Sequence, residues 1–571
     1  MIEPDSTQTQ YIIQAFGLTV DGLALARVLD VREDRRQYLS NGTDESAIAR
    51  VLEPDASLPA NPDDIAEPPS MTGRVILCDG LMPGETAEVL LDDYGTRLLT
   101  ARLVRVLERS PDRVDPFCPV YGECGGCTCQ TLTQEALLFE KQRHIRDCLL
   151  RIARIPEDEV GILLRPILPA ENPTGYRNHM QYQVRLDEGG TFRFGLHARK
   201  SHETVATTDC AIAHPVAELV KNTIEEYLNE PEGRAIRARI PSNAKLIVRV
   251  GTRTGQVLYR LQIPDSGAHK SGASSRIGDS TDCATPVTRE ALPERRSVPR
   301  DRYRLITVTD FDTRISRVLR DFATKYKLAQ NEVEEIIGPR RYFISPQSFF
   351  QVNTVQAERL YNTVLEFFEK TCVRNGAYVT KDSKSDKAPY GATVPEDLNV
   401  AQAPCGANVP EDLNVAQAPC GANVLDLYCG TGSIGLHLSA RAHRIIGIES
   451  SAQAVEDARR NAQINAVPNA EFHVGLAEDY DYESLDLQGP LTVVLDPPRK
   501  GCSPRLLEKL VALAPDHILY VSCDPATLAR DLRLLIEKGY RPEAAQPVDM
   551  FPWTGHVETV VLMSREEQIK T

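Results

Sequence analysis

Residues 424–436 read VLDLYCGTGSIGL. This stretch decides the fold, because an apolar run leads into a glycine turn and the turn leads into a segment with helical periodicity. The same order returns in stretches that begin at Arg444, Leu491 and His517, and a last apolar run follows at 556–564. Short strands that alternate with amphipathic helices predict an α/β fold with a doubly wound parallel sheet, whose ligands bind at the carboxyl ends of the strands.

Two glycines form the turn after the first predicted strand. Gly430 and Gly432 allow the backbone to approach a ligand without a Cβ clash, although their G-x-G spacing lacks the complete dinucleotide fingerprint. The second strand ends at Glu449, 19 residues after Gly430, where a carboxylate can accept hydrogen bonds from two ribose hydroxyls or cap the next helix. These features favour an adenosine-containing cofactor. S-adenosylmethionine fits better than NAD or ATP, because the stretch has no pyrophosphate cradle and no phosphate-binding lysine.

Three reactive side chains stand at the ends of the remaining strands. Asp496 ends the strand of LTVVLDPPRKG, and Cys523 lies between the next strand and a helix N-terminus, where backbone N–H groups can stabilise a thiolate. The alternative for Cys523 is a buried, inert thiol. Glu558 interrupts the last apolar run, either as an edge residue that faces water or as an acid/base group with a raised pKa.

These groups suit methylation of C5 of a uracil. A thiolate that adds to C6 converts the base to an enolate, so that C5 can attack an activated methyl group, and a base must then remove the C5 proton. The scheme needs a nucleophile (Cys523), a polar group that holds the base (Asp496) and a general base (Glu558).

Several longer motifs carry a resemblance to a known family. SPQSFFQVN, LDLYCGTG, VLDPPRKG, YVSCDPATLARDL and DMFPWTGHVETVVLM occur in order over residues 343–563. In these motifs the chain resembles the RNA 5-methyluridine methyltransferases that use S-adenosylmethionine, which include bacterial large-subunit rRNA enzymes and the tRNA T-loop enzyme. The resemblance implies a class I (Rossmann-like) methyltransferase domain over 341–571, with Cys523 as nucleophile and Glu558 as proton-abstracting base. It also implies a cofactor and uracil site lined by Gln351, Tyr428, Glu449 and Asp496.

Two positions depart from the family pattern. Ser433 stands where some members have Asn after the glycine turn. Leu476 occupies the place of an Asp or Asn that contacts adenine, so we assign no residue to that contact.

The N-terminal part alternates short β-rich runs with Gly and Asp turns between residues 8 and 108, which predicts a small barrel. It resembles a TRAM domain, an RNA-binding barrel. We expect this domain at 1–108 with an insertion at 35–70. A β-rich central domain follows at 109–340, with a helix over 132–155 and an insertion at 266–300. The C-terminal domain carries an insertion at 374–423, in which VPEDLNVAQAPCGAN occurs twice in tandem at 394–423, as a duplicated linker.

Residues 117–130 read FCPVYGECGGCTCQ, which admits a disulfide knot, a metal site or chance. The N-terminus has no secretory signal, so we expect a cytoplasmic protein, and structural disulfides are rare there. The segment is similar to the iron–sulfur branch of the family. That resemblance implies a [4Fe–4S] cluster and makes Cys129 a non-ligand, whereas the spacing is unlike that of zinc ribbons. The implied ligands are Cys118, Cys124, Cys127 and Cys210.

The net charge of −15 argues against non-specific binding of nucleic acid. A local basic run at 141–154 could still bind RNA, or it could be a solvated helix face. We expect RNA as the partner, rRNA before tRNA, with the target base extruded from its stack, and no membrane. The alternatives are an RNA cytosine-C5 methyltransferase, which typically has a Pro-Cys pair that DPPRKG lacks, and a non-catalytic RNA-binding or chaperone protein.

Overall fold

The computed structural model describes residues 10–19, 21–32, 72–92, 99–187, 189–264, 303–306, 309–346, 348–374 and 421–566. The predicted insertions at 35–70 and 266–300 lie outside these ranges, as does the insertion at 374–423 apart from its first residue and its last three.

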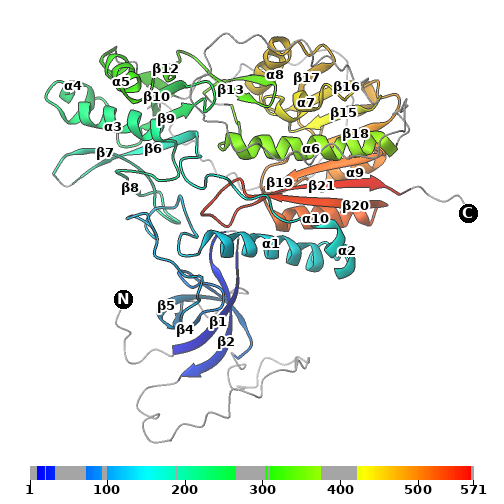
Figure 1. The fold of residues 1–571 in the computed structure, drawn as a ribbon, viewed down its shortest axis with the longest axis horizontal. Coiled ribbons are helices and arrows are strands. Elements are labelled where there is room, and N and C mark those ends of the chain that lie inside the picture. The colour runs from blue at the N-terminus through cyan, green and yellow to red at the C-terminus, as the bar shows by residue number, and fades with distance from the viewer. Residues whose placement is uncertain are drawn as a thin grey trace, which may run out of the picture.

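The N-terminal strands form a closed barrel in the order β1-β2-β3-β5-β4, which confirms the predicted barrel (Figure 1). Its interior is filled by small and β-branched side chains such as Ile13, Ala15, Val28 and Val89. The strands are β1 (Gln10–Leu18), β2 (Ala24–Arg32), β3 (Val75–Cys78), β4 (Thr86–Leu91) and β5 (Leu99–Glu108).

The central part is a sheet in the order β11-β10-β9-β6-β7-β8, with β12 paired to β10. Its core also contains apolar residues of α3 and α5, among them Val220 and Ile315. The elements are β6 (His179–Leu186), β7 (Phe192–His197), β8 (Thr204–Ala206), α3 (Pro215–Asn229), α4 (Arg234–Arg237), β9 (Lys245–Val250), β10 (Gln256–Pro264), β11 (Tyr303–Ile306), α5 (Thr309–Phe322) and β12 (Lys327–Leu328).

The C-terminal part begins with a hairpin and a long helix and ends in a sheet of order β17-β16-β15-β18-β19-β21-β20. The sheet has the predicted α/β alternation, but the expectation of an all-parallel sheet was wrong, because β21 runs antiparallel to both of its neighbours. The elements are β13 (Val333–Ile337), β14 (Arg340–Ile344), α6 (Thr354–Arg374), β15 (Asn423–Leu427), α7 (Ser433–Leu438), β16 (Arg444–Glu449), α8 (Ala452–Ile464), β17 (Ala470–Val474), β18 (Leu491–Leu495), α9 (Pro504–Leu513), β19 (His517–Ser522), α10 (Pro525–Ile536), β20 (Tyr540–Val548) and β21 (Glu558–Arg565).

Two core clusters cover the two faces of this sheet. One contains α6 through Leu360 and Phe367. The other contains α10 and also α1 (Gln134–Arg151) and α2 (Glu157–Leu163), through residues such as Ile145 and Val160. Figure 1 shows α6 along one side of the strands and α1 along the other. The expected helix over 132–155, found as α1, and the unpredicted helix α2 therefore complete the core of the C-terminal sheet, although both lie within 109–340, the range expected for the central domain.

A buried ion pair joins α1 to the end of β20. Lys141 Nζ lies 2.5 Å from Asp549 Oδ1, and the two side chains are 1% and 0% exposed. Lys141→Met would leave the carboxylate buried without its cation, so we expect the free energy of unfolding to fall by about 3–5 kcal/mol in urea denaturation. Arg151→Met is the matched control on the same helix. Its exposed pair with Asp147 contributes less than about 1 kcal/mol, and equal losses in both variants would contradict the prediction.

The predicted basic run at 141–154 is largely neutralised. Four of its five cations pair with acids, so the run is not an uncompensated basic face. The pairs are Lys141–Asp549, Arg143–Glu140, Arg146–Glu157 and Arg151–Asp147.

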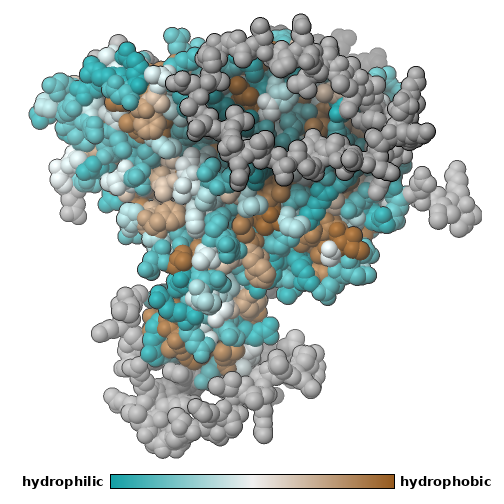
Figure 2. All heavy atoms as spheres, in the orientation of Figure 1, coloured by the Kyte–Doolittle hydropathy of each residue, from teal (hydrophilic) through white to brown (hydrophobic). Residues whose placement is uncertain are grey.

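Within the described ranges, we find no helix that is long and apolar enough to cross a membrane. The face drawn in Figure 2 is mostly hydrophilic, with apolar side chains in small separate patches.

Candidate active site

The three reactive residues gather at one edge of the C-terminal sheet. β15, β18 and β19 run parallel, so their carboxyl ends meet at this edge. β21 starts at the same edge, because it is antiparallel to β19 and Thr559 pairs with Ser522. This register brings Glu558 beside Cys523, and Asp496 follows the neighbouring strand β18. The prediction that strand ends assemble one site agrees with this arrangement.

The turn after β15 leaves room for a ligand. Gly430 has a φ of 53°, and a Cβ built on it would meet nothing within 4 Å. Its N–H donates to Glu449 Oε2 at 3.3 Å, while Ser451 N–H donates to Oε1 at 2.8 Å. The N-cap of α8 is Ser451, whose hydroxyl accepts from Ala454 N, so Glu449 is not needed as the cap. Glu449 is therefore held beside the open turn by two backbone N–H groups.

The other predicted cofactor residues lie around this turn and at a domain seam. Tyr428 follows β15 with a φ of 62°, and its half-buried ring packs against the sheet core. Gln351 is buried, and its backbone carbonyl accepts a hydrogen bond from the Asn178 side chain, one residue before β6. Gln351 thus lies where the central sheet meets the C-terminal domain.

The surroundings of Cys523 favour the protonated thiol over the thiolate. Burial, followed by the nearby Glu558 and Asp496 carboxyls, raises its pKa to about 12. The helix N-terminus that follows does not direct its first free amides at the thiol. The Asp524 side chain already accepts from the N–H groups of Ala526 and Thr527, so these amides are capped. The thiol must therefore lose its proton to a neighbouring group before it can attack.

Two carboxyls near Cys523 have raised pKa values. Glu558 is 3% exposed on an interior strand, which excludes the water-facing edge alternative. Burial and the charge of Asp496 raise the pKa of Glu558 to about 8. Burial likewise raises the pKa of Asp496 to about 7. In the described part of the chain, Glu558 Oε2 has no hydrogen-bond partner, which suits a group that awaits a substrate proton.

Two ionisable neighbours of this site were not predicted from the sequence. Asp426 on β15 is fully buried, and burial raises its pKa to about 7 although its Oδ2 accepts from Gly435 N. Its signal was an acid within the apolar run VLDL. Arg499 follows Asp496 in the DPPRKG motif and lies 2.8 Å from His556 Nε2 through its guanidinium. Its positive charge lowers the pKa of both Cys523 and Glu558 against the larger effect of burial.

The predicted metal ligands share one partly enclosed cavity, formed by the cysteine segment (residues 117–130) and the stretch after β8. Its lining includes the thiols of Cys118, Cys124, Cys127 and Cys210, all of which are free. Cys129 lies instead in the core of the barrel. Over the described ranges, no group of three or more His, Cys, Asp or Glu side chains is arranged to hold a metal ion.

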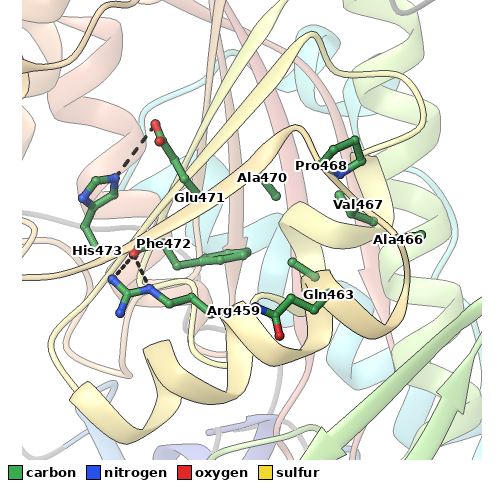
Figure 3. Close-up of a pocket in the computed structure, with 10 residues that line it drawn as sticks. Arg459, Gln463, Ala466, Val467, Pro468, Ala470, Glu471, Phe472 and His473 are labelled. Carbon is green, nitrogen blue, oxygen red and sulfur yellow. Dashed lines mark hydrogen bonds and ion pairs between the residues drawn. The ribbon is translucent and has the colours of Figure 1, made fainter.

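A wide groove of about 680 Å³ lies away from this edge, between α8 and β17. Figure 3 shows Arg459 and Gln463 on its helical side and Glu471 and His473 on its strand side. It contains none of the predicted site residues, so we assign it no part in the chemistry.

Comparisons with known proteins agree with this geometry. A family model described as tRNA (Uracil-5-)-methyltransferase matches residues 412–566. An uncharacterized RNA methyltransferase of Bacillus cereus is 31% identical over 508 residues, which cover 87% of this chain and 93% of the relative. One of Halalkalibacterium halodurans is 29% identical over 500 residues, which cover 86% and 92%.

The fold also matches a solved structure. The Pyrococcus abyssi tRNA (uracil-54, C5)-methyltransferase in complex with S-adenosyl-L-homocysteine superposes with a TM-score of 0.52 and 21% identity, over 86% of this chain and 95% of that chain. At this identity the match concerns the fold alone. The relatives span nearly the whole chain, and the matched family model ends just beyond the strand that carries Glu558. The chain therefore belongs to the RNA 5-methyluridine methyltransferase family and is an RNA methyltransferase.

Proposed function

We propose that the protein methylates C5 of a uridine in RNA from S-adenosylmethionine, through a covalent bond between Cys523 and C6 of the base. The observation that carries the proposal is the pairing of β19 with β21, which brings the Cys523 thiol and the buried Glu558 carboxyl side by side. A nucleophile next to a base with a pKa near neutrality is the arrangement that covalent base methylation needs.

Each residue then has a defined task. A neighbouring carboxylate takes the Cys523 proton, and the sulfur adds to C6. S-adenosylmethionine, when bound, would supply the methyl group that C5 attacks, and its methyl–sulfur bond would break so that S-adenosylhomocysteine leaves. Glu558 accepts the C5 proton, and the Cys523 sulfur leaves as the C5=C6 double bond forms again. Asp496 holds the uracil. The target base must be extruded from its stack to reach this edge of the sheet. Extrusion costs least free energy when the base lies in single-stranded or loop RNA.

We assign the cofactor to the open turn at Gly430. Glu449 would accept hydrogen bonds from the ribose hydroxyls, and Tyr428, Asp496 and Gln351 would line the remainder of the cofactor and uracil site. The carboxylate of Glu449 is already fixed by two N–H donors, so its free lone pairs can face the ligand.

We further propose that Cys118, Cys124, Cys127 and Cys210 hold a [4Fe–4S] cluster. The shared cavity and the free thiols support this assignment.

Iron content tests this assignment directly. We expect protein purified without oxygen to contain about four iron atoms and four sulfides per chain. Cys127→Ser should lose most of both, because one thiolate ligand is gone. Cys129→Ser is the matched control in the same segment and should keep its iron. Zinc in place of iron, or equal iron in the two variants, would contradict the assignment.

The RNA target is proposed as rRNA, with tRNA as the second candidate and the cytoplasm as the location. The thiol segment favours the rRNA branch that it resembles. The N-terminal barrel is the proposed RNA-binding module, because strand-rich barrels of this size present an open face to single strands.

The test is to map 5-methyluridine in total RNA from cells with and without this protein, and to repeat the reaction with purified chain, unmodified RNA and labelled methyl donor. Loss of 5-methyluridine at one rRNA position is the expected result. Loss from tRNA would select the second candidate. Appearance of 5-methylcytidine alone would identify a cytosine enzyme, and no methylation at all would leave an RNA-binding or chaperone role.

A further inference from the structure

The connection between β20 and β21 (residues 549–557, the hairpin loop) leads directly to the proposed general base. Glu558 is the first residue of β21 and pairs with Val548. The position of its carboxyl therefore depends on how this loop is held. Several partners from distant parts of the chain fix the loop, including Lys141 through Phe551 O and Tyr176 through Pro552 O.

The cysteine segment is one of these partners. The backbone N–H groups of Thr128 and Cys129 both donate to Trp553 O, at 3.0 Å each. The Phe117 ring meets the Trp553 ring edge to face, with centroids 5.1 Å apart. The indole Nε1–H of Trp553 donates to Pro173 O at 2.9 Å, which adds a contact from the stretch before β6.

The backbone of Trp553 is bent to make these contacts. Its φ is 65°, a left-handed conformation that costs a bulky side chain about 1–3 kcal/mol. A residue keeps such a conformation only where its surroundings impose it. Here the bend coincides with a carbonyl that accepts both N–H donors of the cysteine segment.

The cysteine segment is also tied to the rest of the molecule. Gly125 N–H donates to His197 O in the central sheet, and Thr131, which directly follows the segment, donates through Oγ1 to Met82 Sδ in the barrel. The segment thus joins the barrel, the central sheet and the hairpin loop. A change in its conformation reaches the loop through Trp553.

We propose that Trp553 is a positioning residue, which couples the order of the cysteine segment to the placement of Glu558. This inference rests on the proposed uridine methylation. The affected step is the last one. The C5–H bond breaks, its proton passes to Glu558, its electron pair forms the C5=C6 double bond, and the C6–S bond breaks to release the Cys523 thiolate. A misplaced Glu558 slows this step while thiol addition and methyl transfer continue.

The test is Trp553→Ala in the full, iron-loaded chain with ordinary uridine RNA. We expect kcat to fall about 10- to 100-fold and KM for RNA to stay within about twofold. A methylated RNA–protein adduct should accumulate on denaturing gels, because its resolution is the slow step. Iron content should be unchanged. Trp553→Phe keeps a ring against Phe117 and should recover most of kcat.

Phe117→Ala removes the other ring of the same contact, the one that belongs to the cysteine segment. Phe117 is 46% exposed, so this variant tests the contact even if Trp553→Ala folds poorly. It should also trap the adduct, and the double variant should lose less kcat than the product of the two single losses. Phe322→Ala is the matched control. It is a half-exposed ring that packs on Tyr326 in the central part, and its loss should leave kcat unchanged.

The outcomes separate the two proposals. A wild-type chain that makes no 5-methyluridine overturns the proposed function and this inference with it. A wild-type chain that turns over, with a Trp553→Ala variant that keeps its kcat or loses it without trapping an adduct, overturns the positioning role alone.

Discussion

Cys523→Ser should abolish methylation, with a turnover rate that falls by at least about 10⁴-fold. A serine hydroxyl in this position has no base strong enough to ionise it, because the nearest carboxyls have pKa values of only about 7 and about 8. The variant should also form no covalent adduct with RNA that carries 5-fluorouridine, which traps the bond between the thiol and C6. The measurements are a labelled-methyl assay and a denaturing gel.

Cys148→Ser is the matched control, because it makes the same exchange at a different thiol, which is buried on α1. It should keep both methylation and adduct formation. Methylation that persists in Cys523→Ser would rule out the proposed nucleophile. Adduct formation that persists there would place the covalent bond on another thiol.

The raised thiol pKa also shapes the pH response. A thiol with a pKa of about 12 is protonated at neutral pH, so attack depends on transfer of its proton to an ionised carboxylate nearby. The carboxylates can accept it only above their own pKa values. These groups interact, so activity should report apparent values of the cluster rather than of single residues. In the proposed reaction, the neighbouring carboxylates therefore remove the thiol proton, and no helix dipole is needed for this step.

The sequence predicted that the candidate site residues lie together at the strand ends, because their placement depends on local patterns. Asp496 and Cys523 each follow a short apolar strand, and parallel strands bring such ends together. The antiparallel direction of β21 could also have been deduced from the length of the connection that precedes it. The hairpin loop at 549–557 is too short for the crossover that a parallel strand requires. The direction of β21 was not predicted, because an apolar run indicates a strand but does not indicate whether that strand is parallel or antiparallel to its neighbours.

Other features could not be obtained from local patterns. The central domain at 109–340 was predicted as β-rich apart from the helix over 132–155, but a second helix, α2, covers residues 157–163 and leaves isolated bridges at Leu164 and Leu168. A first turn with three acids after Pro156 favours a helix, and packing against β20 stabilises it. The role of Trp553 depends on contacts with residues more than 400 positions away, which periodicity does not reveal.

Glu558→Gln should slow turnover about 10²- to 10⁴-fold, because an amide cannot accept the C5 proton. In the wild type the base must be ionised, and its pKa is raised to about 8. The rate of adduct resolution should therefore rise with pH up to about 8 and then level off. The same raised pKa makes the folded state hold this proton more tightly than the unfolded chain. Glu558 should thus contribute less to the stability of the folded state as the pH rises from about 4.5, the ordinary pKa of a glutamate, to about 8.

The variant also separates base catalysis from a general loss of structure. Thiol addition and methyl transfer do not need Glu558, so Glu558→Gln should accumulate a methylated RNA–protein adduct with ordinary uridine RNA. Its residual rate should no longer follow the pH dependence near 8. The double variant Cys523→Ser/Glu558→Gln is the control, and it should show no adduct. An adduct-free Glu558→Gln variant that still binds RNA would mean that the carboxylate acts before C6 addition, as the acceptor of the Cys523 proton.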